Sequence, residues 1–183
     1  EIAVHPLTQN ATKIFGFDAV KVWSNKIFLL YGLIEQGTYD EVHIYYREWN
    51  GTIWKDPIEI GSYTYSDDLS ARDLVCRYYS STNDTIVAFF TIRPGINTNI
   101  ATLRLIALPS NETVWYKSYV EINIGGVSVG ETMLGEILQD PTATNKYYII
   151  FTIHPPLLKQ GDDRLSYATY DISTNSLSWV DSI

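Results

Sequence analysis

A repeat of about sixty residues is the feature that most constrains the fold of this chain. An Asn-x-x-x-Trp frame occurs at residues 50–54, 111–115 and 175–179, which places the tryptophans 61 and 64 positions apart. Long apolar runs recur in step with this frame and begin at Lys26, Thr85 and Lys146, 59 and 61 positions apart. A fixed period of this length indicates copies of one supersecondary unit that bury their apolar faces against one another.

The repeated unit is predicted to consist of four antiparallel strands. Val, Ile, Tyr, Phe and Trp alternate with polar residues or form short runs, and Gly, Pro, Asn or Asp interrupts them every 8 to 15 residues, which favours an all-β fold. We expect propeller-type blades at residues 18–62, 63–124 and 125–183, preceded by an extension at 1–17. A β-sandwich is the alternative, because its strands are similarly short and closely spaced.

One stretch of the first unit resembles a known superfamily. Residues 19–61, with Tyr45-Tyr46-Arg47-Glu48-Trp49 and Asn50-Gly51-Thr52-Ile53-Trp54, are similar to blades of the sialidase-like propellers, which carry an Asp-box (Ser-x-Asp-x-Gly-x-Thr-Trp) between their third and fourth strands. Here the Thr and Trp are present, whereas the Ser and Asp that begin the box are missing from all three units. The resemblance implies a propeller fold and says much less about activity.

Three blades are too few for a closed ring, since propellers have about four to eight. We therefore expect a homo-oligomer, an additional chain or further segments of a longer precursor to complete it. Residues 1–17 could be a strand donated to a neighbour, or a strand that lies on the third unit of the same chain.

The charge and composition argue against several classes of protein. The chain carries 21 acidic and 13 basic residues, for a net charge of -8, which argues against binding to a nucleic-acid backbone. No apolar stretch approaches the roughly 20 residues of a membrane helix, so no membrane span is predicted. The lone Cys76 permits no internal disulfide. The chain begins at Glu1 without a signal peptide, as expected of a processed chain or a fragment.

Four glycosylation sequons point to an exported protein. Asn-x-Ser/Thr occurs at Asn10, Asn50, Asn83 and Asn111, and such sites are modified on exposed loops of exported proteins. The expected location is extracellular, on a cell surface or on a virion surface. The alternative is that these asparagines simply form turns.

The loops after the second and fourth strands of each unit would lie on the face where propellers usually bind ligands. Tyrosine rings can stack on sugars, while carboxylates and amides can bind hydroxyl groups, although these residue types are also common in ordinary loops. The predicted ligand-binding residues are Tyr39, Asp40, Tyr63, Tyr65, Asp67, Asp68, Arg93, His154, Asp162 and Asp163.

The sequence contains no clear catalytic motif. Asp67, Asp68, Asp162 and Asp163 could supply the carboxylate pair of a glycosidase, but no sialidase-type arginine triad is visible and no glycine-rich loop precedes a helix with a lysine. The three histidines are scattered. We predict no catalytic residue, no metal ligand and no cofactor.

These patterns together predict a non-catalytic, surface-exposed binding or assembly module that attaches to glycans or surface proteins. Two alternatives stay open. The chain could be part of a glycan-cleaving propeller hydrolase, or a structural subunit of a surface filament or virion assembled by strand donation.

Overall fold

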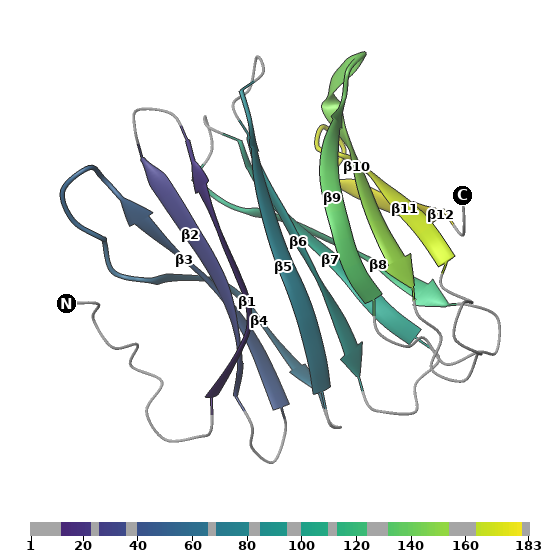
Figure 1. Cartoon of the computed structure of the whole chain (residues 1–183), viewed down its shortest axis with the longest axis horizontal. Helices are drawn as coiled ribbons and strands as arrows, with labels where there is room; N and C mark the ends of the chain where they lie inside the picture. Colours follow the sequence, from purple (N-terminus) through teal and green to yellow (C-terminus); the bar gives the residue numbers. More distant parts are fainter. Residues whose placement is uncertain are drawn as a thin grey trace.

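The described part of the chain folds entirely into antiparallel β-sheets. The computed structural model describes residues 12–22, 26–35, 40–65, 69–80, 85–94, 100–109, 113–123, 132–153 and 164–180, and these residues form three four-stranded sheets (Figure 1). The prediction of three four-stranded units is confirmed, and the three sheets are not closed into a ring.

Each sheet is a meander in which consecutive strands pair with one another. Sheet 1 contains β1 (Thr12–Lys21), β2 (Ile27–Glu35), β3 (Asp40–Trp49) and β4 (Ile58–Tyr65). Sheet 2 contains β5 (Leu69–Tyr79), β6 (Thr85–Pro94), β7 (Ile100–Pro109) and β8 (Tyr116–Asn123). Sheet 3 contains β9 (Thr132–Asp140), β10 (Ala143–Ile153), β11 (Arg164–Asp171) and β12 (Ser176–Val180).

Two strand boundaries in sheet 1 differ from the sequence prediction. β1 begins at Thr12 and pairs with β2, so residues 12–17, expected in the N-terminal extension, belong to the sheet of their own chain. β4 begins only at Ile58, because Trp54 makes only an isolated bridge to Trp49 and Pro57 has no N–H to donate to a ladder. It ends at Tyr65, past the expected end of the unit at residue 62.

The three sheets stack in chain order, and sheet 2 lies in the middle (Figure 1). We call the face that points to the preceding sheet the back and the face that points to the following sheet the front. Alternating residues of β6 divide between them: Ala88 and Phe90 on the back join the core shared with sheet 1, and Val87 and Phe89 on the front join the core shared with sheet 3. All four side chains are fully buried.

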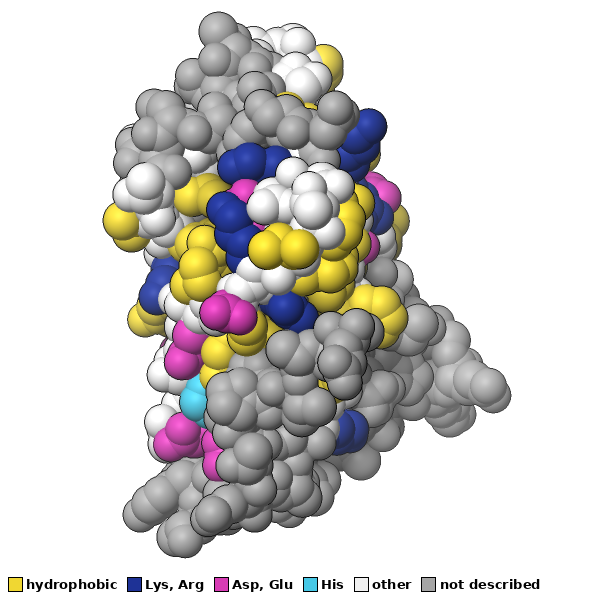
Figure 2. All heavy atoms as spheres, turned by 90° about the vertical axis from the view of Figure 1, so that its left-hand side faces the viewer, with side chains coloured by type: hydrophobic (Ala, Val, Ile, Leu, Met, Phe, Trp, Pro, Cys, Tyr) yellow, Lys and Arg dark blue, Asp and Glu magenta, His cyan; other side chains and the backbone are white. Residues whose placement is uncertain are grey.

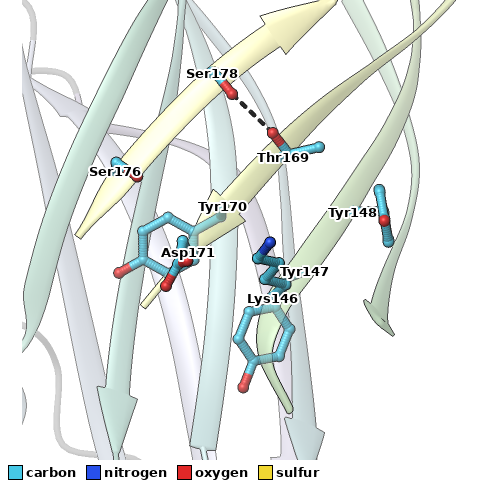
Figure 3. A pocket seen from close by; sticks show the side chains of 8 residues that line it. All are labelled: Lys146, Tyr147, Tyr148, Thr169, Tyr170, Asp171, Ser176 and Ser178. Atoms are coloured by element: carbon cyan, nitrogen blue, oxygen red, sulfur yellow. Dashed lines mark hydrogen bonds between the residues drawn. The ribbon is translucent and has the colours of Figure 1, made fainter. Parts of the chain in front are cut away.

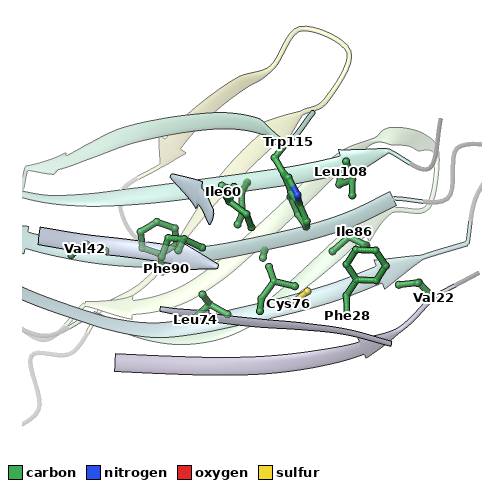
Figure 4. Close-up of a cluster of buried hydrophobic side chains, with 14 of the residues drawn as sticks. Val22, Phe28, Val42, Ile60, Leu74, Cys76, Ile86, Phe90, Leu108 and Trp115 are labelled. Atoms are coloured by element: carbon green, nitrogen blue, oxygen red, sulfur yellow. The ribbon is translucent and has the colours of Figure 1, made fainter. Parts of the chain in front are cut away.

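The core between sheets 1 and 2 is built from the front of one sheet and the back of the other (Figure 4). Phe28 and Leu30 of β2 on the front of sheet 1 meet Ile86 and Phe90 of β6. Gly16 of β1 permits close approach, since a Cβ built there would lie 2.7 Å from the backbone nitrogen of Leu74. The second core repeats this front-to-back arrangement between sheets 2 and 3.

A chain of ion pairs joins the first strands of the three sheets at the period of the repeat. Asp18 of β1 accepts a hydrogen bond from Arg77 Nη1 of β5 at 2.9 Å, and Arg77 donates from Nε and Nη2 to both carboxylate oxygens of Glu136 in β9 at 2.6 and 3.1 Å. Each step spans 59 residues. The hydrogen bonds from Arg77 hold the pKa of Glu136 below its usual value. The repeat seen in the sequence is therefore also a repeat of inter-sheet contacts.

Candidate binding faces

The sequence-predicted ligand loops are only partly within the described residues. Tyr39, Asp67, Asp68, His154, Asp162 and Asp163 lie outside them. Asp40 and Tyr65 are opposite one another in the β3–β4 ladder, and Arg93 lies near the end of β6 opposite Ser70. The backbone thus brings Asp40 and Tyr65 together at one end of sheet 1, and a ligand site built from these loops stays a prediction.

Tyr63 is a correction to the predicted set. It was expected in an exposed loop, but it lies in β4 opposite Val42 and packs against the core between sheets 1 and 2. Its ring centroid lies 6.0 Å from that of Phe90, and the Arg104 guanidinium carbon lies 4.0 Å above the ring. The register of the β3–β4 ladder shifts between Ile44 and Tyr45, so that Ile60 and Tyr63 both point to the inside of the stack.

The one sequon asparagine among the described residues forms a turn. Asn50 is exposed, and its side-chain oxygen accepts hydrogen bonds from the backbone N–H groups of Thr52 and Ile53, both at 3.0 Å. Gly51 follows it with a φ of 97°, which glycine adopts without steric cost. Asn10, Asn83 and Asn111 lie outside the described residues. The turn-forming role is present at Asn50, and glycosylation remains a prediction.

The front of sheet 3 is open, in the sense that no described sheet covers it, and it contains a hollow of about 250 Å³. The ring pair of Tyr148 and Tyr167, 6.3 Å apart, lies on this front face. The Thr169 and Ser178 hydroxyls are 2.7 Å apart across the β11–β12 pair (Figure 3). The hollow is lined by Lys146, Tyr147, Tyr148, Thr169, Tyr170, Asp171, Ser176 and Ser178.

The carboxylates near this hollow are held ionised by local hydrogen bonds. The Ser173 hydroxyl and backbone N–H hydrogen-bond to Asp171 Oδ1 and lower the pKa of Asp171. Thr142 lowers the pKa of Asp140 in the same way, and Asp140 accepts a hydrogen bond from the Tyr148 hydroxyl at 2.9 Å. This bond raises the pKa of Tyr148. Neither carboxylate has the raised pKa that a glycosidase acid requires.

The back of sheet 1 is the second open face, and apolar side chains of β1 and β2 lie on it beside charged ones. Ile14 and Phe17 of β1 lie opposite Leu33 and Tyr31 of β2 and are 62% and 72% exposed. Tyr31 in turn stacks on Tyr45 of β3 with ring centroids 5.6 Å apart. Figure 2, viewed from this side of the molecule, shows hydrophobic side chains across its middle and acidic ones below them, beside the histidine.

His43 lies among three glutamates at one end of this open face. Its Nδ1 is 3.1 Å from Glu59, and its Nε2 is 3.3 Å from Glu41 and 3.8 Å from Glu35. The neighbouring Tyr45 is buried, and burial together with the charge of Glu59 raises its pKa to about 12. Within the described residues, no three imidazole, thiol or carboxylate groups are placed to hold a metal ion.

The periodic tryptophans all lie on the back of their sheets. Trp115 is 8% exposed in the core between sheets 1 and 2, where its ring lies 5.4 Å from that of Tyr46 on the front of sheet 1 (Figure 4). Trp179 packs against the core between sheets 2 and 3. Trp54 bridges to Trp49 of β3, has its ring tilted at 52° against that of Trp49 and is 36% exposed. The buried Trp115 and the partly buried Trp179 therefore anchor their sheets to the preceding ones.

Sequence reasoning found these tryptophans but missed the two open faces. It placed candidate ligands in loops, whereas the hollow and the exposed Phe17 lie on strands. Phe17 is opposite Tyr31 on a strand that was expected to begin at 18. A signal was available in the alternation from Ile14 to Ala19, which continues the strand pattern upstream of residue 18.

Comparisons with known proteins support the architecture alone. No family model and no curated protein matches the chain. Among solved structures, a mutant of Synechocystis ACO superimposes with a TM-score of 0.51 at 8% sequence identity, over 96% of this chain and 40% of that one. The chain thus spans two fifths of the length of that structure. The similarity shows a shared fold, and the sialidase-like resemblance stays a prediction.

The described residues contain no helix with the length and apolarity needed to cross a bilayer.

Proposed function

We propose that this chain is a non-catalytic binding and assembly module that works outside the cell, on a cell or virion surface. Its open faces would bind further sheets of the same kind. The observation that carries the proposal is the contrast between sheet 2, buried on both faces, and sheets 1 and 3, each of which keeps one open face with large apolar side chains.

The open faces have the composition of an interface. Ile14 and Phe17 on sheet 1, and Leu138, Leu165 and Val180 on sheet 3, are each at least 39% exposed. Each of these residues lies on the open face by its strand pairing. Contiguous apolar surface of this kind marks binding sites in folded proteins, because its burial is favourable by about 25 cal/mol per Å².

Location outside the cell is supported by the sequons and by the exposed turn at Asn50. Mass spectrometry of protein from its native source, before and after enzymatic removal of N-linked sugars, tests this part. A mass equal to that of the unmodified chain would contradict glycosylation.

Assembly is tested by sedimentation velocity over a wide range of protein concentration. We expect concentration-dependent association that Phe17→Asp weakens at least about tenfold, since loss of a buried aromatic side chain is worth more than about 1.4 kcal/mol. Val114→Asp is the matched control: Val114 is 67% exposed, but it lies in a turn of sheet 2, whose faces are both covered. A wild-type protein that stays monomeric at millimolar concentration would contradict assembly by this chain.

Glycan attachment is the second candidate, favoured by the hollow on sheet 3. Its hydroxyl groups, the Lys146 side chain and the Tyr148 ring offer the polar and stacking contacts that sugars require. Titration with a panel of oligosaccharides, monitored by calorimetry, tests it, and Lys146→Ala should weaken binding of a sugar held in the hollow. No heat with any sugar, or equal heat with the variant, would contradict this site.

A further inference from the structure

We propose that Trp54 of one copy of this chain inserts into the hollow on the front of sheet 3 of a second copy. This inference rests on the proposed assembly function and names its partner and its anchor residue. The docking would repeat, between molecules, the contact that Trp115 already makes inside the molecule.

Trp54 and Trp115 are equivalent residues of the repeat. Trp54 and Trp115 occupy the same place in the Asn-x-x-x-Trp frame and both lie on the back of their sheet. Trp115 packs against the preceding sheet and is 8% exposed, whereas no described sheet lies behind sheet 1 and Trp54 is 36% exposed. The position in the repeat is therefore the same, and the two tryptophans differ in the presence of a described partner sheet.

Trp115 packs against an aromatic surface on the front of sheet 1. Its ring lies against Tyr46, whose ring stacks on Phe28 with centroids 5.5 Å apart and an interplanar angle of 14°. Phe28 comes from β2 and Tyr46 from β3, where Tyr46 is opposite Leu30. An aromatic pair on neighbouring strands of the front face is thus the receptor for the tryptophan.

The open front of sheet 3 carries an aromatic pair at the equivalent positions. Counted from the starts of the apolar runs at Lys26, Thr85 and Lys146, Phe28 corresponds to Val87 and Tyr148, and Leu30 corresponds to Phe89 and Ile150. Ile150 is opposite Tyr167, so Tyr148 and Tyr167 take the places of Phe28 and Tyr46. Their rings are also neighbours, 6.3 Å apart.

The hollow beside this aromatic pair has a lining that suits an indole ring. An indole needs an apolar or aromatic wall and an acceptor for its N–H. Tyr148 supplies the wall, and the Thr169 and Ser178 oxygens and the Asp171 carboxylate are acceptors on the same lining. The Lys146 ammonium can add a cation–π contact to the indole face.

Front and back faces differ, so the contact is heterologous and joins copies head to tail. Two copies would bring six sheets together, which lies within the four to eight that close a propeller. In such a ring each copy inserts its Trp54 into the other, and the contact forms twice.

The experiment pairs a variant without the anchor with a variant without the hollow. Trp54→Ala keeps the hollow, while Ser178→Arg fills the hollow and keeps Trp54. Ser178 is exposed on the end strand of sheet 3, so the substitution leaves the core unchanged; circular dichroism checks that both variants fold. Thr174→Arg, an exposed change in the neighbouring turn, is the control for added charge.

We expect sedimentation to show association weakened more than tenfold in each single variant and unchanged in Thr174→Arg. A mixture of Trp54→Ala with Ser178→Arg should recover part of the association, because the intact Trp54 of one variant meets the intact hollow of the other.

If the wild type associates but both variants associate equally well, this docking is wrong and the assembly function stands. If the wild type does not associate, both are wrong. A sugar whose binding is lost in Ser178→Arg, with no recovery in the mixture, would assign the hollow to a glycan and overturn the docking.

Discussion

The same position in the repeat has opposite surroundings in sheets 1 and 2. Trp115 lies in a core between two sheets, whereas Trp54, its counterpart, contacts the Trp49 ring and is 36% exposed on a face that no described sheet covers. The two sheets share their strand order and their alternation. The comparison shows that the burial of the tryptophan at this position of the repeat depends on the neighbouring sheet.

Removing the two indoles is the sharpest way to test this difference. Trp115→Ala should lower the free energy of unfolding by about 3–5 kcal/mol, as expected for a buried aromatic side chain. In the monomer, Trp54→Ala should cost less than about 1 kcal/mol, since surface positions tolerate substitution. Chemical denaturation at low protein concentration measures both. Equal losses would show that Trp54 is part of a core.

Gly16 tests how closely sheets 1 and 2 must approach. Gly16→Ala should destabilise the protein by about 1–3 kcal/mol, because the added Cβ meets the backbone nitrogen of Leu74 at 2.7 Å and backbone atoms cannot rotate away. Gly61→Ala is the matched control. A Cβ there would meet the ends of the flexible Lys117 and Tyr63 side chains at 3.3 and 3.4 Å. A smaller loss for Gly16 than for Gly61 would contradict the close packing of β1 on β5.

The ion-pair chain predicts a loss of stability in acid. The pKa of folded Glu136 is lowered by the hydrogen bonds from Arg77. Its ionised form therefore stabilises the fold above the ordinary glutamate pKa, and this contribution disappears as the pH falls through the lowered value. The thermal midpoint should fall below about pH 4.5, and Glu136→Gln should make that fall shallower.

The partner variant separates this pair from other acidic groups. Once Arg77 has been replaced by Met, the further change Glu136→Gln should alter the pH profile little, because the hydrogen bonds that lower the pKa are gone. An unchanged effect of Glu136→Gln in that background would argue against the Arg77 pairing as the cause.

Asn50 should give the smallest effect. Replacing it with Ala removes two acceptor contacts in an exposed turn of sheet 1, at a cost of about 0.5–1.5 kcal/mol. Denaturation measures the loss, and Asn50→Asp, which keeps an acceptor oxygen, should retain most of the stability. Equal losses in the two variants would show that the acceptor oxygen at position 50 is not the cause of the stability that the turn contributes.

The repeat carried most of the fold prediction. The spacing of the apolar runs gave three four-stranded units, and the second strand of the middle unit, from Thr85 to Phe90, is fully buried as a continuous apolar run suggests. The boundaries were less predictable. Tyr63 lies in the core instead of a loop because β4 continues to Tyr65 and its register against β3 shifts between Ile44 and Tyr45, an effect that depends on pairing with β3 and has no local signature.

The open faces could not be predicted from composition. Leu29 and Tyr31 on β2 look like Ala88 and Phe90 on β6, yet only the second pair is covered. Strand alternation identifies which residues share a face, but it does not give the number of layers above that face. The hollow depends on the tertiary placement of β10, β11 and β12.

Cys76 is a built-in probe for the separation of sheet 1 from sheet 2, because its thiol reacts only when it is exposed. The thiol is fully buried between sheets 1 and 2, and burial together with the nearby Asp18 carboxylate raises its pKa, so it is inert while the layers are closed. Sheet 3 can detach without uncovering it, whereas departure of sheet 1 exposes it. The rate of alkylation by a small reagent therefore reports the opening of the interface between sheets 1 and 2. It does not report the opening of the interface between sheets 2 and 3.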